Sequence, residues 1–413
     1  IVATRRFAAP VIGRPAGGTY AFTPIPDVYT AFYAMGWHDL DSDGRLDAVF
    51  GTYDNEQLKT QGLIFQTRGG GGVFVYTATA TGYRAARLSD NAQALAIAFP
   101  DLDRDGHADI YVGNDFNTPD HAWRNTAAGY VAAAPFSQTT ENTMSLDYAD
   151  TNNDGEIDLY ATDMKPFDQD VATLAQWLPA MGKLTRPLSA DDPQYTENTL
   201  YRWDGKGWDN TAYEQQLDAT GWSWSATFAD LDDNGWQDLY VVNGMKATDL
   251  LGYLPNSEIA EADMLFATDD GVSYTIAQRG LENTGSGRAA VMADLDGDGD
   301  LDVAVNPIDG PAQLYENHLC GTQRLLVTLV DPTTANRDAI GAEARLETAA
   351  ATQTRTVAVM RGYLSGYATT QHFGLGDATA VGPLVIRWPD GAESTITDVP
   401  VDQHLVITRK AAP

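Results

Sequence analysis

The sequence is poor in cysteine and in basic side chains. Cys320 is the single cysteine among 413 residues, so no disulfide can form within the chain, and stability has to come from packing, backbone hydrogen bonds and bound ions. The 26 Lys and Arg residues are outnumbered by 57 Asp and Glu residues, which gives a formal net charge of −31 at pH 7. Phosphate groups repel such a chain, so we expect no nucleic-acid partner.

Long apolar runs are absent as well. The longest, residues 94–99, is far shorter than the ~20 residues with which a helix crosses a bilayer, so we expect no membrane span. No positively charged and then apolar leader is visible at the start, so a signal peptide is not present in this chain, and we expect a mature or trimmed form.

Motifs of common enzymes are missing too. The six histidines are scattered and no two have metal-ligand spacing, so a zinc or iron site is not expected. There is no Gly-x-Ser-x-Gly elbow, P-loop or dinucleotide fingerprint, and the glycine run 69–72 lacks the lysine and helix of a phosphate site. The sequence therefore argues against standard hydrolases and cofactor-dependent enzymes.

What the chain does contain is one acidic nine-residue pattern, repeated five times. The copies begin at residues 39, 101, 150, 230 and 294, with Asp or Asn at positions 1, 3 and 5, Gly at position 6 and Asp at position 9. A mostly apolar stretch precedes each copy and a β-prone stretch follows it. Each copy therefore predicts two strands joined by a tight loop, in which the Gly supplies a positive φ.

These loops predict cation sites. Side-chain oxygens at positions 1, 3, 5 and 9 can converge on one ion, and the backbone carbonyl of position 7 can complete its shell. Calcium accepts six to eight such ligands, whereas magnesium requires an octahedron and zinc prefers His or Cys. Crowded carboxylates would repel one another without a cation, so we expect about five Ca²⁺ sites. The expected ligand residues are Asp39, Asp41, Asp43, Arg45, Asp47, Asp101, Asp103, Asp105, His107, Asp109, Asp150, Asn152, Asp154, Glu156, Asp158, Asp230, Asp232, Asn234, Trp236, Asp238, Asp294, Asp296, Asp298, Asp300 and Asp302.

Two details of the pattern restrict this interpretation. An EF-hand needs a glutamate at position 12, which is apolar in all five copies, so EF-hands are excluded. Position 4 is not expected to contact the ion, and it is occupied by Asp233 in the fourth loop.

Further strands between the loops predict a β-propeller. Four antiparallel strands in each repeated unit are typical of a propeller blade. In the first unit, the expected third and fourth strands are Leu63–Gln66 and Val73–Thr77. We predict an all-β fold with a calcium-binding propeller of five loop-bearing blades. The fifth unit lacks a clear fourth strand, so Tyr20–Thr23 could close the ring, and a further loop-free blade at the N-terminus stays open.

The order of the strands also predicts two faces. The acidic loops join strands 1 and 2, whereas two long insertions, 164–198 and 244–263, join strands 2 and 3 and must emerge on the opposite face. The first insertion contains an expected short helix over 171–181. Long loops on a rigid scaffold commonly carry the binding residues, so we expect the ligand on the insertion face.

The repeats and the tail resemble known families. The loop-and-strand units resemble the Ca²⁺-binding FG-GAP and VCBS repeats, and Gly221–Asp230 resembles the subgroup of cartilage acidic protein and UnbV. The segments 336–342, 361–365, 372–377 and 387–391 are similar to the ASPIC/UnbV domain. From residue 325 the pattern becomes that of a small antiparallel β-sandwich, so we expect domains at 1–317 and 318–413.

Several side chains are candidates for a site on the insertion face. Asp115, Asp147 and Asp163 are the carboxylates that could act as acid or base, and Asp147 is unusual because it replaces a small or apolar residue on a first strand. Trp222, Trp224 and Tyr363 could stack on rings of a ligand, although core packing is the commoner role of such residues.

Two hypotheses of function follow. The first is a calcium-stabilised propeller, secreted or periplasmic, that binds a glycan, a protein or a small molecule through the insertion face. The alternative is a cofactor-independent enzyme, a cyclase, lyase or isomerase of secondary metabolism or sugar chemistry, that uses carboxylates or bound calcium. A closed pocket with converging carboxylates would favour the enzyme, and an open rim would favour binding.

Overall fold

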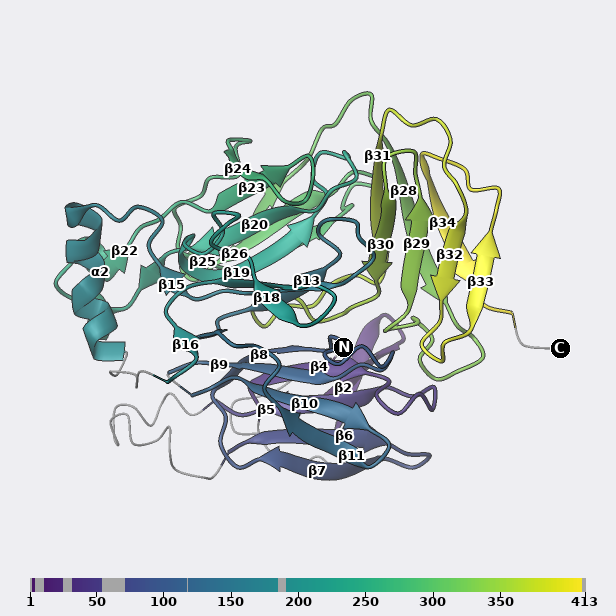
Figure 1. The fold of residues 1–413 in the computed structure, drawn as a ribbon, viewed down its shortest axis with the longest axis horizontal. Coiled ribbons are helices and arrows are strands. Elements are labelled where there is room, and N and C mark those ends of the chain that lie inside the picture. The colour runs from purple at the N-terminus through teal and green to yellow at the C-terminus, as the bar shows by residue number, and fades with distance from the viewer. Residues whose placement is uncertain are drawn as a thin grey trace.

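The computed structural model describes residues 2–3, 11–24, 32–53, 71–116, 118–184 and 191–410, and its regular structure is almost entirely β (Figure 1). This confirms the predicted all-β fold. No helix in these ranges is both long and apolar enough to cross a membrane.

Four antiparallel sheets carry the first four acidic loops between their first two strands. In each, four successive strands form a meander in which the chain adds one strand after another to the same edge, and in the fourth sheet the short strand Met164–Lys165 also pairs with the first strand at the other edge. Their strands are β4 (Ala34–His38), β5 (Asp47–Gly51), β6 (Val73–Ala78) and β7 (Tyr83–Ser89); β8 (Ala94–Ala98), β9 (Ile110–Asn114), β10 (His121–Thr126) and β11 (Gly129–Ala133); β13 (Leu146–Ala149), β14 (Asp158–Ala161), β17 (Thr199–Trp203) and β18 (Trp208–Asn210); and β19 (Gly221–Ala229), β20 (Asp238–Asn243), β23 (Met264–Thr268) and β24 (Tyr274–Ala277).

The first sheet corrects the predicted strand assignment. Val73–Ala78 pairs directly with β5 and is the third strand, not the fourth, and Tyr83–Ser89 is the fourth strand. The predicted strand Leu63–Gln66 lies outside the described residues. The error arose because β7 is an exposed edge strand that carries two arginines and small side chains without apolar alternation, so its hydrophobic pattern is weak.

The fifth loop lies in a sheet of three strands, β25 (Gly287–Ala293), β26 (Asp302–Pro307) and β27 (Gln313–Tyr315). The N-terminal strand that was expected to complete it does not pair with it. Instead, β3 (Thr19–Pro24) pairs with β2 (Val11–Ala16), and β1 (Val2–Ala3) adds to the other edge of β2.

First strands of successive sheets lie side by side in the order β4, β8, β13, β19, β25. Buried apolar clusters fill the space between adjacent sheets. One joins Val49 and Val75 of the first sheet to Ile97 and Val112 of the second. Another joins Tyr160 of the third sheet to Phe228 and Val241 of the fourth. This stacking of sheets around their first strands is the packing of propeller blades.

The C-terminal segment forms a β-sandwich. One sheet has the order β31 (Gln371–Gly376), β28 (Gln323–Val330), β34 (Gln403–Thr408), and the other β30 (Thr352–Thr356), β29 (Glu343–Glu347), β32 (Leu384–Arg387), β33 (Glu393–Ile396). Leu325, Phe373, Leu384 and Trp388 are buried between the two sheets. Contrary to the prediction, the sandwich is not wholly antiparallel, because β28 and β34 pair in parallel.

The two insertions pack together. Helix α2 (Val171–Leu184) begins where predicted and runs one turn longer, and it lies against α3 (Thr248–Leu251). Trp177 of α2 and Trp222 of β19 bury their rings with centroids 5.2 Å apart. The remaining short elements are β12 (Thr139–Thr140), β15 (Met164–Lys165), β16 (Gln194–Tyr195), β21 (Met245–Lys246), β22 (Glu258–Ile259) and the 3₁₀ turn η3 (Pro255–Ser257).

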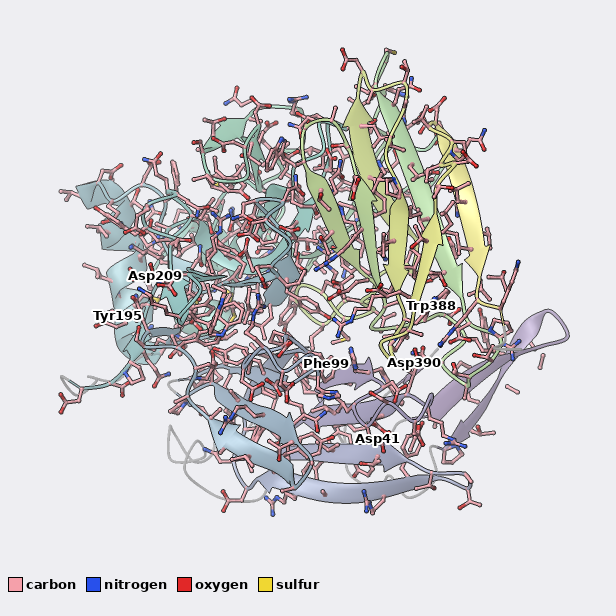
Figure 2. The ribbon with its side chains drawn as sticks, turned by 45° about the vertical axis from the view of Figure 1, so that its right-hand side comes forward. Asp41, Phe99, Tyr195, Asp209, Trp388 and Asp390 are labelled. Atoms are coloured by element: carbon pink, nitrogen blue, oxygen red, sulfur yellow. The ribbon has the colours of Figure 1, made fainter. Side chains whose placement is uncertain are left out.

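The insertions and the sandwich lie at opposite ends of the molecule. Figure 1 shows α2 at one edge and β28 to β34 at the other, with the propeller sheets between them. In Figure 2, Asp41 of the first loop lies toward the sandwich that carries Trp388 and Asp390, and Tyr195 lies at the far side. The acidic loops therefore face the sandwich, and the other face is left to the insertions.

Candidate metal centres and the two faces of the propeller

All five acidic loops have the same backbone shape. The Gly at position 6 has a positive φ in each loop, as predicted, with values from 82° at Gly44 to 96° at Gly299. Position 4 is also left-handed in each loop, although four of these residues are not glycine. Amide groups then point inward, so that Asp39 accepts hydrogen bonds from the backbone N–H groups of Asp43 and Gly44.

The carboxylates converge in three of the loops. Ligand oxygens within each of three groups lie within 4.8 Å of one another. The groups are Asp39, Asp41 and Asp43; Asp101, Asp103 and Asp109; and Asp294, Asp296 and Asp302. A cation of calcium's size, with oxygen ligands at ~2.4 Å, fits between oxygens at this separation.

Buried oxygens without partners fit a cation in the other two loops. Asp150 and Asp230, both at position 1, are at most 1% exposed, and one carboxylate oxygen of each makes no hydrogen bond among the described residues. Asp232 has a similar oxygen. A buried carboxylate oxygen without a partner lowers the stability of the fold, and a bound cation would supply that partner. These atoms therefore fit the oxygen-rich shell that calcium requires.

Burial makes the loop carboxylates hard to ionise in the absence of a cation. It raises the pKa of Asp39 to about 6 and that of Asp47 to about 7, although backbone hydrogen bonds partly oppose both shifts. Burial likewise raises the pKa of Asp150 and Asp230 to about 6. A divalent ion would supply the missing positive charge.

The Asp at position 9 also fastens each loop to its sheet. Asp47 accepts the Leu40 N–H with one oxygen and the Ala78 N–H with the other, at 3.0 and 2.7 Å. Asp109 does the same with Leu102 and Asn125, at 2.9 and 2.7 Å. Carboxylate oxygens have further lone pairs, so these bonds leave the position able to bind an ion.

The sandwich contacts the acidic loops directly. Ala335 and Asn336 donate backbone N–H groups to the Gly44 carbonyl, each at 2.9 Å, and Gly374 donates its N–H to Asp230 at 3.1 Å. In the fifth loop, Asp300 is completely buried and pairs with Arg324 of β28 at 3.3 Å. The sandwich therefore covers part of the face that carries the loops, and carboxylates such as Asp41, Asp103 and Asp296 stay exposed.

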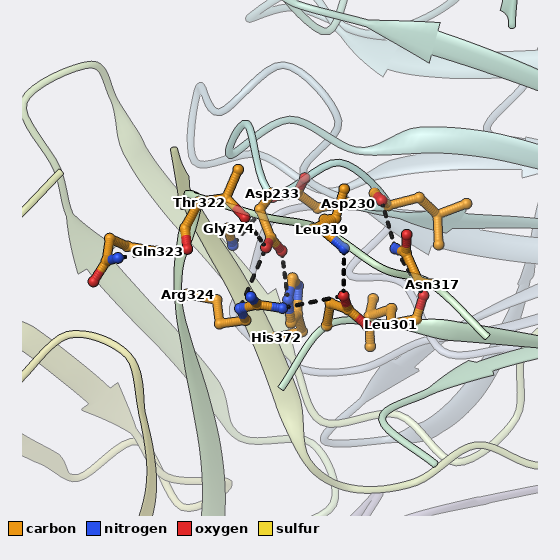
Figure 3. Close-up of polar contacts among 12 residues, drawn as sticks. Asp230, Asp233, Leu301, Asn317, Leu319, Thr322, Gln323, Arg324, His372 and Gly374 are labelled. Atoms are coloured by element: carbon orange, nitrogen blue, oxygen red, sulfur yellow. Dashed lines mark hydrogen bonds and ion pairs between the residues drawn. The ribbon is translucent and has the colours of Figure 1, made fainter. Parts of the chain in front are cut away.

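Asp233 is the centre of one such contact (Figure 3). It is completely buried, accepts a hydrogen bond from the Thr322 hydroxyl at 2.9 Å, and lies 3.4 Å from Arg324 and 3.0 Å from His372. The position that was expected to have no metal contact thus has a different role, because it binds the sandwich to the fourth loop.

A segment of the sandwich also enters the propeller. In residues 357–370, Arg361 forms two hydrogen bonds with Asp147 of β13, at 2.6 and 2.8 Å, and donates to the Phe228 carbonyl. Tyr367 donates to the Ala290 carbonyl of β25. Asp147 is fully buried and also accepts the Phe228 N–H at 2.6 Å. The unusual acid on a first strand is thus paired with an arginine of the sandwich.

The other two carboxylate candidates lie on different elements. Asp163 is completely buried and accepts backbone N–H groups from Glu141, Asn142 and Met164, and burial raises its pKa well above the usual range. Asp115 accepts the Tyr53 hydroxyl at 2.8 Å, and burial raises its pKa to about 6. Asn142 links two of the candidates, because it donates to Asp163 and accepts the Phe116 N–H that Asp115 also accepts, whereas Asp147 is paired with Arg361.

The aromatic candidates are divided between core and surface. Trp222 is 1% exposed and packs in the insertion core. Trp224 and Tyr363 are partly buried, with ring centroids 5.2 Å apart, and the Arg288 guanidinium lies 4.0 Å from the Trp224 ring centroid. The Tyr363 hydroxyl lies 3.3 Å from that of Tyr33.

An open hollow on the insertion side contains residues that the sequence did not single out. It measures about 610 Å³ and is lined by Phe167, Gln169, Tyr213, Glu214, Gln216, Asp218 and Ala219. Tyr213 is 75% exposed and Phe167 43% exposed. Each is an isolated aromatic residue in a loop, so nothing in the sequence separated them from core residues.

Fold and loops together define a propeller of acidic-loop repeats capped by a β-sandwich, and comparison with known families agrees. Residues 39–112 and 101–161 match the FG-GAP-like repeat, and residues 332–413 match ASPIC and UnbV. The chain therefore carries FG-GAP-like repeats and an ASPIC/UnbV domain, as the sequence motifs indicated. No curated protein matches it.

Several solved structures resemble the chain weakly. A Lactobacillus plantarum protein is 9% identical, with 96% of this chain and 97% of that chain covered and a TM-score of 0.40. The Vibrio cholerae biofilm matrix protein Bap1 is 14% identical over 90% of this chain and 60% of its own, with a TM-score of 0.33. A functionally unknown protein from Desulfotomaculum acetoxidans is 9% identical, covering 76% and 80% of the two chains, with a TM-score of 0.39. Scores this low carry no conclusion about function.

Proposed function

We propose that this protein is a calcium-stabilised propeller that binds a neutral glycan on the insertion face. The observation that carries the proposal is the open hollow with two exposed aromatic rings, Phe167 and Tyr213. Exposed apolar side chains that gather in one place mark contact sites for a partner more often than scattered ones do. Val171, Leu178, Tyr195 and Tyr253, in or beside the same insertions, are exposed as well.

The chemistry of the lining favours a sugar. Aromatic rings can stack on the apolar face of a sugar ring, and the amide groups of Gln169 and Gln216 can pair with hydroxyl groups as both donors and acceptors. Glu214 and Asp218 can accept further hydroxyl hydrogens. A chain with a net charge of −31 repels acidic glycans, so the expected ligand is neutral.

Calcium would act on the scaffold in this proposal. The acidic loops lie on the side that faces the sandwich, whereas the hollow is lined by residues of the first insertion and of the connection from β18 to β19. Ions in the loops would therefore hold the sheets in place without touching the glycan. Millimolar calcium outside the cytoplasm would keep the sites filled, in agreement with a secreted or periplasmic protein. We propose the domains 1–317 and 318–413 as the propeller and its cap.

Binding is favoured over the enzyme alternative by the positions of the carboxylates. Asp147 is paired with Arg361, Asp163 is held by backbone N–H groups, and Asp115 is bonded to Tyr53. A cyclase, lyase or isomerase would need acid and base groups that converge on one substrate.

The test is a screen of the full chain against an array of neutral oligosaccharides, followed by titration of the strongest binder into variants. Tyr213→Ala and Phe167→Ala should each weaken binding by roughly five- to thirtyfold, because a stacked ring is worth on the order of 1–2 kcal/mol. Tyr20→Ala is the matched control, since Tyr20 is 46% exposed on the separate β2–β3 hairpin. An array without binders, or equal affinity of all variants, would contradict the proposal.

A further inference from the structure

A cavity of about 280 Å³ lies between the propeller and the sandwich. One part of its wall is apolar, with Phe228, Met292 and Leu326, and the other part is polar, with Arg355, Arg361, His372, His404 and Gln371 among its residues. Cavities at domain interfaces are common sites for small molecules, and this volume is near the lower end of their usual range, ~300–1,000 Å³.

The polar wall carries a buried cation that forms no close ion pair, although the carboxylates of Asp150 and Asp230 act on it electrostatically. Arg355 is 7% exposed, and its acceptors are neutral: the carbonyls of His372 and Thr354 and the amide of Gln353. Gln237, oriented with its oxygen toward Arg355, adds a further neutral acceptor. No carboxylate in the described ranges lies within 4.0 Å of this guanidinium, although the chain is strongly acidic. A buried positive charge of this kind favours an anion nearby.

Two nitrogen atoms on the same wall lack partners in the part of the chain that the structure describes. Arg361 uses Nε and Nη2 on Asp147 and the Phe228 carbonyl, which leaves Nη1 with no hydrogen bond. His372 is 8% exposed, and its Nδ1 has no partner, while its Nε2 faces Asp233. A buried polar atom without a partner, such as His372 Nδ1, is destabilising, so a ligand that engages it would be favoured, and Arg361 Nη1 offers a further donor on the same wall.

The two carboxylates in the lining do not fill this role. Asp230 and Asp294 occupy position 1 of the fourth and fifth acidic loops, where their oxygens are expected to face a cation. One wall of the cavity thus offers cationic and hydrogen-bonding groups, and the opposite wall offers apolar surface.

We propose that this cavity binds a small organic carboxylate. The carboxylate lies against Arg355, Arg361 Nη1 and His372, and the apolar part of the ligand lies against Phe228, Met292 and Leu326. Since these residues come from both the propeller and the sandwich, the ligand also connects the two. This site is separate from the hollow on the insertion face and does not depend on glycan binding.

Isothermal titration calorimetry of the full chain at one fixed calcium concentration tests the site, with acetate, butyrate, benzoate and sulfate as probes. Butyrate should bind roughly tenfold more tightly than acetate, because two more CH₂ groups are buried, and sulfate should bind most weakly. No binding by any carboxylate, or binding of sulfate equal to the best carboxylate, would overturn the proposal.

Two variants locate the binding. Ala368 is exposed and lines the cavity, so Ala368→Leu should fill it and weaken butyrate binding at least tenfold without disturbing the core. His372→Gln should weaken binding similarly. Ala127→Leu, the same change in an exposed hairpin away from the cavity, is the control and should bind as the parent chain does. Unchanged affinity in Ala368→Leu would place the ligand elsewhere and refute the assignment.

Discussion

Chelation of calcium with EGTA is expected to lower the melting temperature by roughly 15 °C. One site stabilises the fold by about 2.7 kcal/mol when free calcium is one hundred times the Kd. The stabilisation free energies of about five such sites add to one another. Unfolding entropy of ~2.1 cal/mol/K per residue over 413 residues converts that sum into a shift of this size. Calorimetry with and without chelator measures it.

The physical reason is the crowding of buried carboxylates in the loops. Without a cation, burial opposes the ionisation of Asp47 and Asp158 and raises the pKa of each to about 7. Calcium added back in excess should restore the original melting curve. Magnesium should not, since it requires octahedral geometry. A melting curve that EGTA leaves unchanged would contradict the assignment of the loops.

Asp147→Ala is expected to destabilise the protein by about 3–5 kcal/mol, the usual cost of leaving a buried charge without its partner. The substitution leaves the Arg361 guanidinium without either of its carboxylate contacts, and it also leaves the buried Phe228 N–H without an acceptor. Because Arg361 belongs to the segment that enters the propeller, the change weakens the contact between the propeller and the sandwich. Urea denaturation followed by tryptophan fluorescence measures the loss.

A double-mutant cycle provides the control for this prediction. Arg361→Ala in the Asp147→Ala background should cost less than it does alone, because the pair is already broken. Asp209→Ala, on the outer strand β18 of the same sheet, should change stability by less than about 0.5 kcal/mol, since Asp209 is exposed. Additive losses in the cycle would show that the two residues do not act as a pair.

The repeated loops could be predicted because their information is local. Nine consecutive residues determine the turn, so the positive φ at Gly44 and at the equivalent glycines follows from the sequence alone. The all-β fold followed from the strands on either side of each loop. The first sheet was assigned wrongly beyond β5, since β7 at its edge has no apolar alternation to mark it.

Contacts between distant segments could not be predicted in this way. Asp233 was expected only to make no contact with the ion, and its contacts with Thr322, Arg324 and His372, which lie far along the chain, were not foreseen. Asp147 was recognised as unusual from the sequence, yet its partner Arg361 is 214 residues away. Such pairs depend on how the sandwich packs on the loops, which no local pattern encodes.

In the candidate site, too, the sequence predicts local properties but not which side chains the folded chain exposes. Trp222 and Trp224 were chosen for their residue type, and packing buried the first while leaving the second partly accessible. Tyr213 was overlooked because an isolated tyrosine gives no sign of its exposure. Residue type indicates which chemistry a side chain can perform, but the folded surface decides which side chains can reach a ligand.

The central claim is that the five acidic loops hold calcium ions beneath the sandwich. Its most direct test is the metal content of the purified chain after dialysis against calcium, counted by elemental analysis and by native mass spectrometry. We predict about five calcium ions for each chain. A chain that retains no calcium, and that takes up none when calcium is added, would contradict the account.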